Sequence, residues 1–332
     1  MTQRSSRRDA LAAGLSLATG CTRWDQPVAA AMPSSPVAIL RAADYSIDLV
    51  VALREGARLC KLKLHGRRVL IKPNLVEFDR ATAINTDARL VAAVVELVRS
   101  LGAAEVTIGE GPGHRRDTLG LAEEAGYFRE IPGFERLFVD LNRDDVVARP
   151  GFLDGGRIYL PASILDADVV ISVPKLKTHH WAGVTLSMKN LFGVVPGAVY
   201  GWPKNPLHYA GIDRSIVELN RLFRNTFAIV DGIVGMEGNG PIQGLAKALG
   251  VIVMSPDVVA ADSTCARLMG IAPGKIGHLH QCGGLGNWEE NRIVQRGEQP
   301  ASVMRRFELP PGLEEVRAAH LDDFASTTKA FC

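Results

Sequence analysis

Cysteine is scarce in this chain of 332 residues, and its five copies stand far apart. Ferredoxin-type clusters and structural zinc sites need closely spaced thiolates, and the sequence contains no Cys-x-x-Cys pair. We therefore expect isolated thiols and no iron–sulfur cluster, with a disulfide in an oxidising compartment as the alternative. The five cysteines are Cys21, Cys60, Cys265, Cys282 and Cys332.

Several catalytic and binding signatures are also missing. There is no Gly-x-Ser-x-Gly elbow, which argues against a serine hydrolase, and no His-Glu-x-x-His metalloprotease motif. The formal net charge is only +2, without a run of lysine and arginine, so we expect no nucleic-acid partner. Any basic feature that matters must be local.

The N-terminus resembles an export signal. Arg7-Arg8 follows Ser6, and the apolar stretch 10–17 is too short to span a bilayer, which is typical of a twin-arginine signal. Cleavage is expected at Ala29-Ala30-Ala31 or, alternatively, before a lipid-modified Cys21, the one membrane tether that we expect. Residues 1–36 are then signal and linker of a periplasmic or otherwise extracytoplasmic protein; the alternative is a disordered tail with a chance arginine pair.

The remaining residues, 37–332, predict a single α/β domain with a mainly parallel sheet and helices on both faces. Hydrophobic residues make up 47% of the chain, enough for a large core. Continuous aliphatic runs indicate strands that are covered on both faces, and helical patterns lie between them. The Gly-rich stretch 274–297 is expected to be an excursion or a cap over the site. The expected strands are 69–71, 106–108, 137–139, 169–173, 227–230 and 251–254, and the expected helices 87–101, 118–125, 215–223 and 258–269.

Polar residues follow most of the predicted strands. In an open α/β sheet, ligands bind beyond the carboxyl ends of the strands, so these residues predict one pocket. Lys72 and Asn74 flank a proline after the first strand, and His114 ends a Gly-rich turn after the second. We expect all three to bind substrate. The alternatives are a solvated lysine and an ordinary tight turn, because the turn matches neither a dinucleotide fingerprint nor a P-loop.

The strongest signal follows the strand 169–173. Lys175, Lys177 and His179 stand at alternate positions, so an extended backbone would turn them to the same side. Three cations in one place suggest a multiply charged anion, such as a phosphate or polycarboxylate, and burial would lower a lysine pKa toward a catalytic range. The alternative is a basic surface loop.

Further candidates come later in the chain. Lys189 and Asn190 lie in an apolar stretch, where a lysine needs a function or an ion pair. Carboxylates could act as acid or base, bind a divalent metal, or neutralise the lysines. Asp231 and Glu237 are the acid/base candidates, Asn239 a substrate-binding one, and Asp231, Glu237, Asp257 and Asp262 the metal-binding ones; His179, His180 and His208 are alternative metal ligands.

Together these segments resemble the domain-of-unknown-function family numbered 362. The resemblance is carried by the stretches 71–76, 173–179, 184–193 and 230–241, which read IKPNLV, VPKLKTH, VTLSMKNLFG and VDGIVGMEGNGP. Many members of that family carry an added ferredoxin-like cysteine module, which is absent here. The resemblance therefore implies the shared fold and pocket, but neither a cluster nor a particular reaction.

Three functions remain open. The first is an exported enzyme that acts on a small anion, with lysines to orient it and Asp231 or Glu237 as acid or base, helped or not by a divalent metal. The second is a periplasmic protein that binds such an anion without transforming it. The third, by family analogy alone, is an accessory protein for redox or metal chemistry.

Overall fold

The structure, a computed structural model, describes residues 33–318. Its main sheet has ten strands in the order β12-β1-β11-β10-β7-β2-β3-β4, with β8 and β9 attached beside β10, while β5 and β6 form a separate hairpin. The strands are β1 Ser35–Arg41, β2 Arg68–Pro73, β3 Glu105–Glu110, β4 Phe138–Asp140, β5 Val146–Phe152, β6 Gly156–Pro161, β7 Val169–Val173, β8 Lys175–His179, β9 Gly183–Thr185, β10 Thr226–Glu237, β11 Leu245–Ser255 and β12 Ile293–Gly297.

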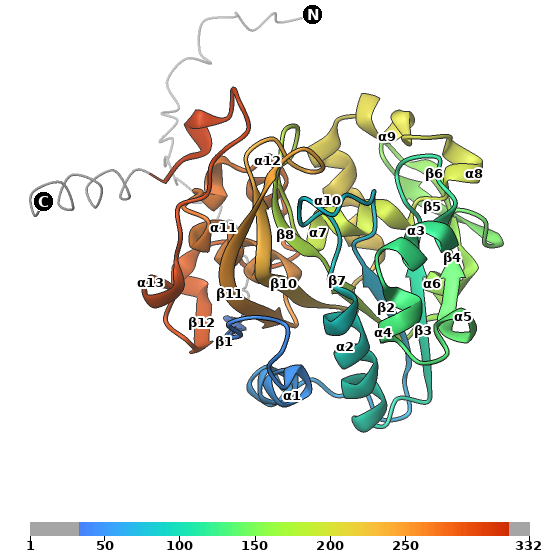
Figure 1. The fold of residues 1–332 in the computed structure, drawn as a ribbon. Helices are drawn as coiled ribbons and strands as arrows, with labels where there is room; N and C mark the ends of the chain where they lie inside the picture. The colour runs from blue at the N-terminus through green and yellow to red at the C-terminus, as the bar shows by residue number, and fades with distance from the viewer. Residues whose placement is uncertain (1–32, 319–332) are drawn as a thin grey trace, which may run out of the picture. The chain divides into compact units, whose positions relative to one another are not determined.

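Helices occupy both faces of this sheet (Figure 1). Each long helix that the sequence predicted is present within three residues of the expected bounds. The helices are α1 Leu49–Leu59, α2 Ala88–Ser100, α3 Thr118–Glu124, α4 Tyr127–Glu130, α5 Phe134–Leu137, α6 Ala162–Asp166, α7 Ser187–Asn190, α8 Gly197–Tyr200, α9 Asn205–Tyr209, α10 Ile212–Leu222, α11 Val258–Leu268, α12 Gly277–His280 and α13 Pro300–Val303; the 3-10 turns are η1 Leu191–Val194, η2 Pro273–Lys275, η3 Glu290–Arg292 and η4 Glu314–Val316.

The core has two layers, one on each side of the sheet. Val69 and Ile71 of β2 pack with α1 and α2, whereas Leu70 between them belongs to the layer that contains α7, α10 and α11. This alternation explains the continuous aliphatic runs, because a strand buried on both faces needs apolar residues at every position. The predicted α/β class, with helices on both faces of a mostly parallel sheet, is confirmed.

The sheet is less uniformly parallel than the sequence suggested. The central neighbours β10, β7, β2, β3 and β4 are parallel, but β11 runs antiparallel to both β10 and β1. β10 continues to Glu237, well past the expected end at residue 230, so the acid/base candidates Asp231 and Glu237 lie within the strand. Gly232 and Gly235 also lie inside β10.

Three smaller expectations also change. β1 begins at Ser35, inside the expected linker, and β12 lies within the stretch 274–297, where it pairs in parallel with β1. No residue of that stretch lines the main cavity described below, so it is not a cap.

Cys60, Cys265 and Cys282 are free thiols. Within residues 33–318, no helix is both long and apolar enough to cross a bilayer. The expected signal, with Cys21, lies outside the described residues.

The turn after β10 packs closely against the backbone at the end of β8. A Cβ on Gly240 would lie 2.1 Å from the carbonyl oxygen of Thr178, and both the backbone N–H and Nδ1 of His180 bond to the Gly240 carbonyl. We predict that Gly240→Ala lowers the free energy of unfolding by roughly 1–3 kcal/mol, because the backbone must shift to accept the methyl group. Urea denaturation measures the change. Gly113→Ala is the control, since its added Cβ meets nothing within 4 Å; equal losses in both variants would contradict the packing argument.

Candidate functional site

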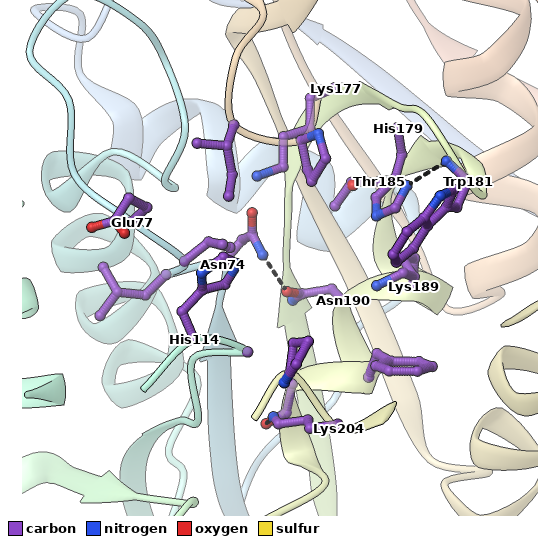
Figure 2. Close-up of a pocket in the computed structure, with 18 of the residues that line it drawn as sticks. Asn74, Glu77, His114, Lys177, His179, Trp181, Thr185, Lys189, Asn190 and Lys204 are labelled. Atoms are coloured by element: carbon purple, nitrogen blue, oxygen red, sulfur yellow. Dashed lines mark hydrogen bonds between the residues drawn. The ribbon is translucent and has the colours of Figure 1, made fainter. Parts of the chain in front are cut away.

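A cavity of about 870 Å³ opens where β2, β3 and β8 end. The connection after β2 forms one wall, and β8, β9 and α7 form another. Figure 2 shows Asn74, Glu77 and His114 on one side and Trp181, Thr185 and Lys189 on the other. The strand-end rule therefore located the cavity correctly. Of the predicted site residues, those that line it are Lys72, Asn74, His114, Lys177, His179, His180, Lys189, Asn190, His208 and Asn239.

Lys72 forms a buried ion pair at the floor of the cavity. Its Nζ lies 2.7 Å from both carboxylate oxygens of Glu110 at the end of β3, and neither side chain is more than 2% exposed. Glu110 also accepts the backbone N–H groups of Leu75 and Gly111. Burial lowers the pKa of Lys72, against the opposing effect of Glu110. This pair ties the ends of two parallel strands together, so Lys72 is not the solvated lysine of the alternative interpretation.

Two asparagines connect this floor to α7. Asn190 donates through Nδ2 to the backbone carbonyl of Lys72 and to Ser172 Oγ, and its Oδ1 accepts from Asn74 Nδ2 at 3.2 Å. Asn74 Oδ1 is buried without a hydrogen-bond partner within residues 33–318. A buried acceptor of this kind costs free energy unless a donor reaches it, so it is a candidate contact for a ligand.

Lys177 is the most exceptional group in the cavity. Its side chain is fully buried on β8, and the one hydrogen bond of its Nζ within the described residues goes to the carbonyl of Ile84, at 2.8 Å. Burial lowers its pKa well below the ordinary value, and Lys189 and Lys175 nearby lower it further. The charged form of Lys177 is therefore disfavoured when the cavity holds no anion.

Two more lysines approach from α7 and from the loop before α9. Lys189 lies over the ring of Phe192, with Nζ 4.3 Å from the ring centroid, and burial lowers its pKa to about 8. Lys204 donates to the backbone carbonyls of Gly111 and Gly193, and burial lowers its pKa to about 7. Both lysines change charge close to physiological pH.

His179 is held in one tautomer. Its Nδ1 accepts the backbone N–H groups of Trp181 and Ala182, at 3.1 and 3.2 Å, so the ring proton must sit on Nε2. Burial lowers the pKa of His179 well below its usual value, and the positive charge of Lys189 adds to this effect. His179 is thus a neutral imidazole that presents an N–H donor at the cavity wall.

The cavity carries an excess of potential positive charge. Its described lining contains five lysine or arginine side chains and two glutamates. Both glutamates are already paired, Glu110 with Lys72 and Glu77 with Arg116 at 2.6 Å. No carboxylate is left within this lining to neutralise Lys177, Lys189 or Lys204.

The expectation that Lys175 and Asp231 join this cavity is wrong. Their side chains form an ion pair of 2.6 Å, and Tyr45 bonds to both of them. Asp231 also accepts the backbone N–H of Asp87. Lys175 lines a second cavity of about 640 Å³, on the other side of the connection after β2. The network uses both charges, so Asp231 has no free oxygen for acid–base chemistry.

The other predicted carboxylates are also used in structural bonds. Glu237 pairs with Lys247 and accepts the N–H of Glu308. Asp257 caps α11, and Asp262 accepts the N–H groups of Ser187 and Met188 at the start of α7. Burial raises the pKa of Asp262 to about 7. Within residues 33–318, no group of three His, Cys, Asp or Glu could hold a metal ion. The structure therefore does not assemble the predicted carboxylate metal site.

Some cavity residues were missing from the sequence-based set. Glu110 stood in the Gly-rich turn but was not assigned a role. Lys204, which has a positive φ of 69°, Thr185 and Trp181 carried no strand-end signal. Thr185 lies opposite Lys177 in the β8–β9 pairing, and its Oγ1 is buried without a partner in the part of the chain that the structure describes. If the sequence analysis had predicted a β-hairpin around Gly183, it would have placed Thr185 opposite Lys177.

The network around Asp231 gives a stability prediction. We expect Asp231→Ala to lower the free energy of unfolding by roughly 3–5 kcal/mol, because it leaves the ammonium of Lys175 buried without a carboxylate. Urea denaturation measures the loss. The control is Glu55→Ala, which removes an exposed ion pair with Arg58 and should change stability little. If Asp231→Ala were as stable as the control, Asp231 would not be structural and would return as a catalytic candidate.

Comparisons with known proteins agree with the sequence pattern. The family model described as "Domain of unknown function (DUF362)" matches residues 69–267. A thylakoid-associated protein of Synechocystis sp., sll1697, is 33% identical over 217 residues, which are 64% of this chain and 65% of that protein, just under two thirds of its length. The lactate racemase apoprotein from Thermoanaerobacterium thermosaccharolyticum matches at a TM-score of 0.44 and 12% identity, covering 72% of this chain and 57% of that one. Since the family model spans more than half of the sequence, the chain belongs to the DUF362 family.

Proposed function

We propose that the cavity binds a small anion, a phosphate or carboxylate compound, and that the protein is an enzyme that transfers a proton to or from it. One observation carries this proposal: lysines of lowered pKa are buried together without free carboxylates to neutralise them. Burying such groups is costly, and proteins keep costly polar groups where a ligand or a reaction uses them.

The binding step would draw on two lysines and a hydroxyl. Lys189 makes no hydrogen bond within residues 33–318 and Lys177 makes one, so the ammonium of Lys189 and the amine of Lys177 both have N–H groups left for an anion. Thr185 Oγ1 lies between them in the sequence and has no partner among the described residues. The negative charge of the anion would raise the pKa of Lys189, so that binding takes up protons near pH 8.

The chemical step would use the neutral groups. With one N–H donated to Ile84, the amine of Lys177 keeps a lone pair that can accept a proton from the substrate. The Nε2–H of His179 would stabilise negative charge that develops in the transition state, since a fixed donor in a dry site acts strongly. Lys189, with a pKa of about 8, can return a proton. Asp231 and Glu237 have no part in this scheme.

A second function is favoured by the same lining. Binding needs cations but no free acid or base, and the described lining holds no unpaired carboxylate. An anion-binding protein without catalysis is therefore the alternative. For either function we also propose export by the twin-arginine route, which rests on Arg7-Arg8 and the short apolar stretch alone.

The lysine pKa values predict how affinity depends on pH. A lysine is charged below its pKa, so the population of the Lys189 ammonium falls about tenfold for each pH unit above 8. We expect inorganic phosphate or citrate to bind about tenfold more weakly at pH 9 than at pH 7, and to take up protons when it binds at pH 8. Calorimetry in two buffers of different ionisation enthalpy measures both effects. Lys189→Met should weaken the pH dependence, because only Lys204 then still titrates near pH 7. Lys63→Met, at an exposed lysine outside the cavity lining, should keep the full dependence. Equal affinity of the wild-type protein at both pH values would overturn the assignment.

Lys177→Met separates binding from chemistry. Burial lowers the pKa of Lys177 in the folded chain, so between that pKa and about pH 10.4 the unfolded chain holds a proton that the folded chain does not. The wild-type protein should therefore gain stability as pH rises toward 10, and Lys177→Met should gain less, because the contribution of Lys177 is lost while those of Lys189 and Lys204 remain. Lys177→Met should be at least as stable as the wild type at pH 7. Urea denaturation at several pH values measures this.

The same variant tests catalysis. Compounds that bind would be incubated in D₂O, and exchange of their carbon-bound hydrogens followed by mass spectrometry. The enzyme hypothesis expects exchange with the wild-type protein and none with Lys177→Met. Binding without exchange in the wild type would leave the anion-binding alternative.

A further inference from the structure

The cavity is too large for an inorganic anion. Cavities of roughly 300–1,000 Å³ hold ligands the size of a drug or cofactor, and this one measures about 870 Å³. The lysines that can bind an anion belong to β8 and α7, which supply only part of the lining. The lining also includes apolar side chains from other segments, such as Ile242 and Pro311. An inorganic phosphate at the lysines would leave most of this volume unfilled.

Aromatic rings line the same side as the lysines. Trp181 stands in the turn between β8 and β9, and its backbone N–H is held by His179. Its ring centroid lies 4.8 Å from that of His180 and 5.3 Å from that of His208, both at steep angles, and His208 lies 5.0 Å from Phe192. Figure 2 shows the indole of Trp181 beside Lys189 at the cavity wall.

Trp181 is 61% exposed even though it lines the cavity. An indole of this size contributes stability when it is covered, so an exposed one at a cavity wall is available to a ligand ring. His208 adds a second unused group, because its Nδ1 is buried without a partner in the described part of the chain. The aromatic wall and the lysines belong to adjacent segments, so one ligand can reach both.

We propose that the ligand is an aromatic anion, with a phosphate or carboxylate head and a planar ring. The head binds between Lys177, Lys189 and Thr185, and the ring stacks on Trp181. The β8–β9 hairpin carries three of these four groups, because Lys177 lies opposite Thr185 and Trp181 follows in the turn. This inference rests on the proposed anion site and names the part of the ligand that the lysines do not contact.

The test compares three probes by calorimetry at pH 7: inorganic phosphate, phenyl phosphate and cyclohexyl phosphate. Stacking of a ring on an aromatic side chain contributes on the order of 1–3 kcal/mol, so phenyl phosphate should bind roughly 5- to 150-fold more tightly than inorganic phosphate. Cyclohexyl phosphate has similar bulk but no planar ring, and it should bind more weakly than phenyl phosphate. Trp181→Ala should remove the gain of phenyl phosphate and leave the affinity for inorganic phosphate within about twofold, while Trp181→Phe should keep most of the gain.

Tyr209→Ala is the control, since Tyr209 is 85% exposed and does not line the cavity. It should change neither affinity. If no probe binds, the proposed anion site itself fails. If inorganic phosphate binds but phenyl phosphate is no tighter, or if cyclohexyl phosphate matches it, the anion site stands and the ring contact is overturned. The ring contact is also overturned if Trp181→Ala weakens the binding of all three probes equally.

Discussion

The length of strand β10 is the constraint on which the site depends. β10 has twelve residues; its first part pairs in parallel with β7, and its second part pairs in parallel with β8. The chain after Val173 therefore stays at the sheet instead of turning out into solvent. Residues that would otherwise form a basic surface loop are drawn into the interior, where Lys175 meets Asp231 directly across the pairing. β9 then folds back on β8 and adds Thr185 opposite Lys177.

The lysines of the two cavities differ in the groups that their Nζ atoms contact. Lys72 and Lys175 have carboxylates and act as structural cations that join strand ends. Lys204 has two backbone carbonyls, Lys177 has one, and Lys189 has an aromatic ring. A carbonyl or a ring replaces only part of the hydration of an ammonium ion, so desolvation lowers the pKa of these three. In the proposed function, these three lysines bind an anion when they are charged and accept a proton when they are neutral.

Sequence reasoning succeeded where the pattern is local. Aliphatic runs gave the central strands, and the strand-end rule brought Lys72, Asn74 and Lys177 into one cavity. It failed where pairing is long-range. The expected strand ended at residue 230, so Asp231 was assigned to the main cavity and its ion pair with Lys175 was missed. Which lysine meets which carboxylate depends on strand order and register, and neither is written in the spacing of residues along one segment.

The loss of Asp231 and Glu237 from the site also changes the chemistry that it can support. In the proposed reaction the base is the amine of Lys177 and not a carboxylate, because burial disfavours the charged form of Lys177. Protonation of His179 at Nδ1 would oppose two backbone N–H donors, so this ring stays neutral and acts as a donor from Nε2. Such a pair suits a substrate that already carries its own negative charge. In the proposed complex the charged head would favour the ammonium of Lys189, while the reacting part of the molecule would meet uncharged groups.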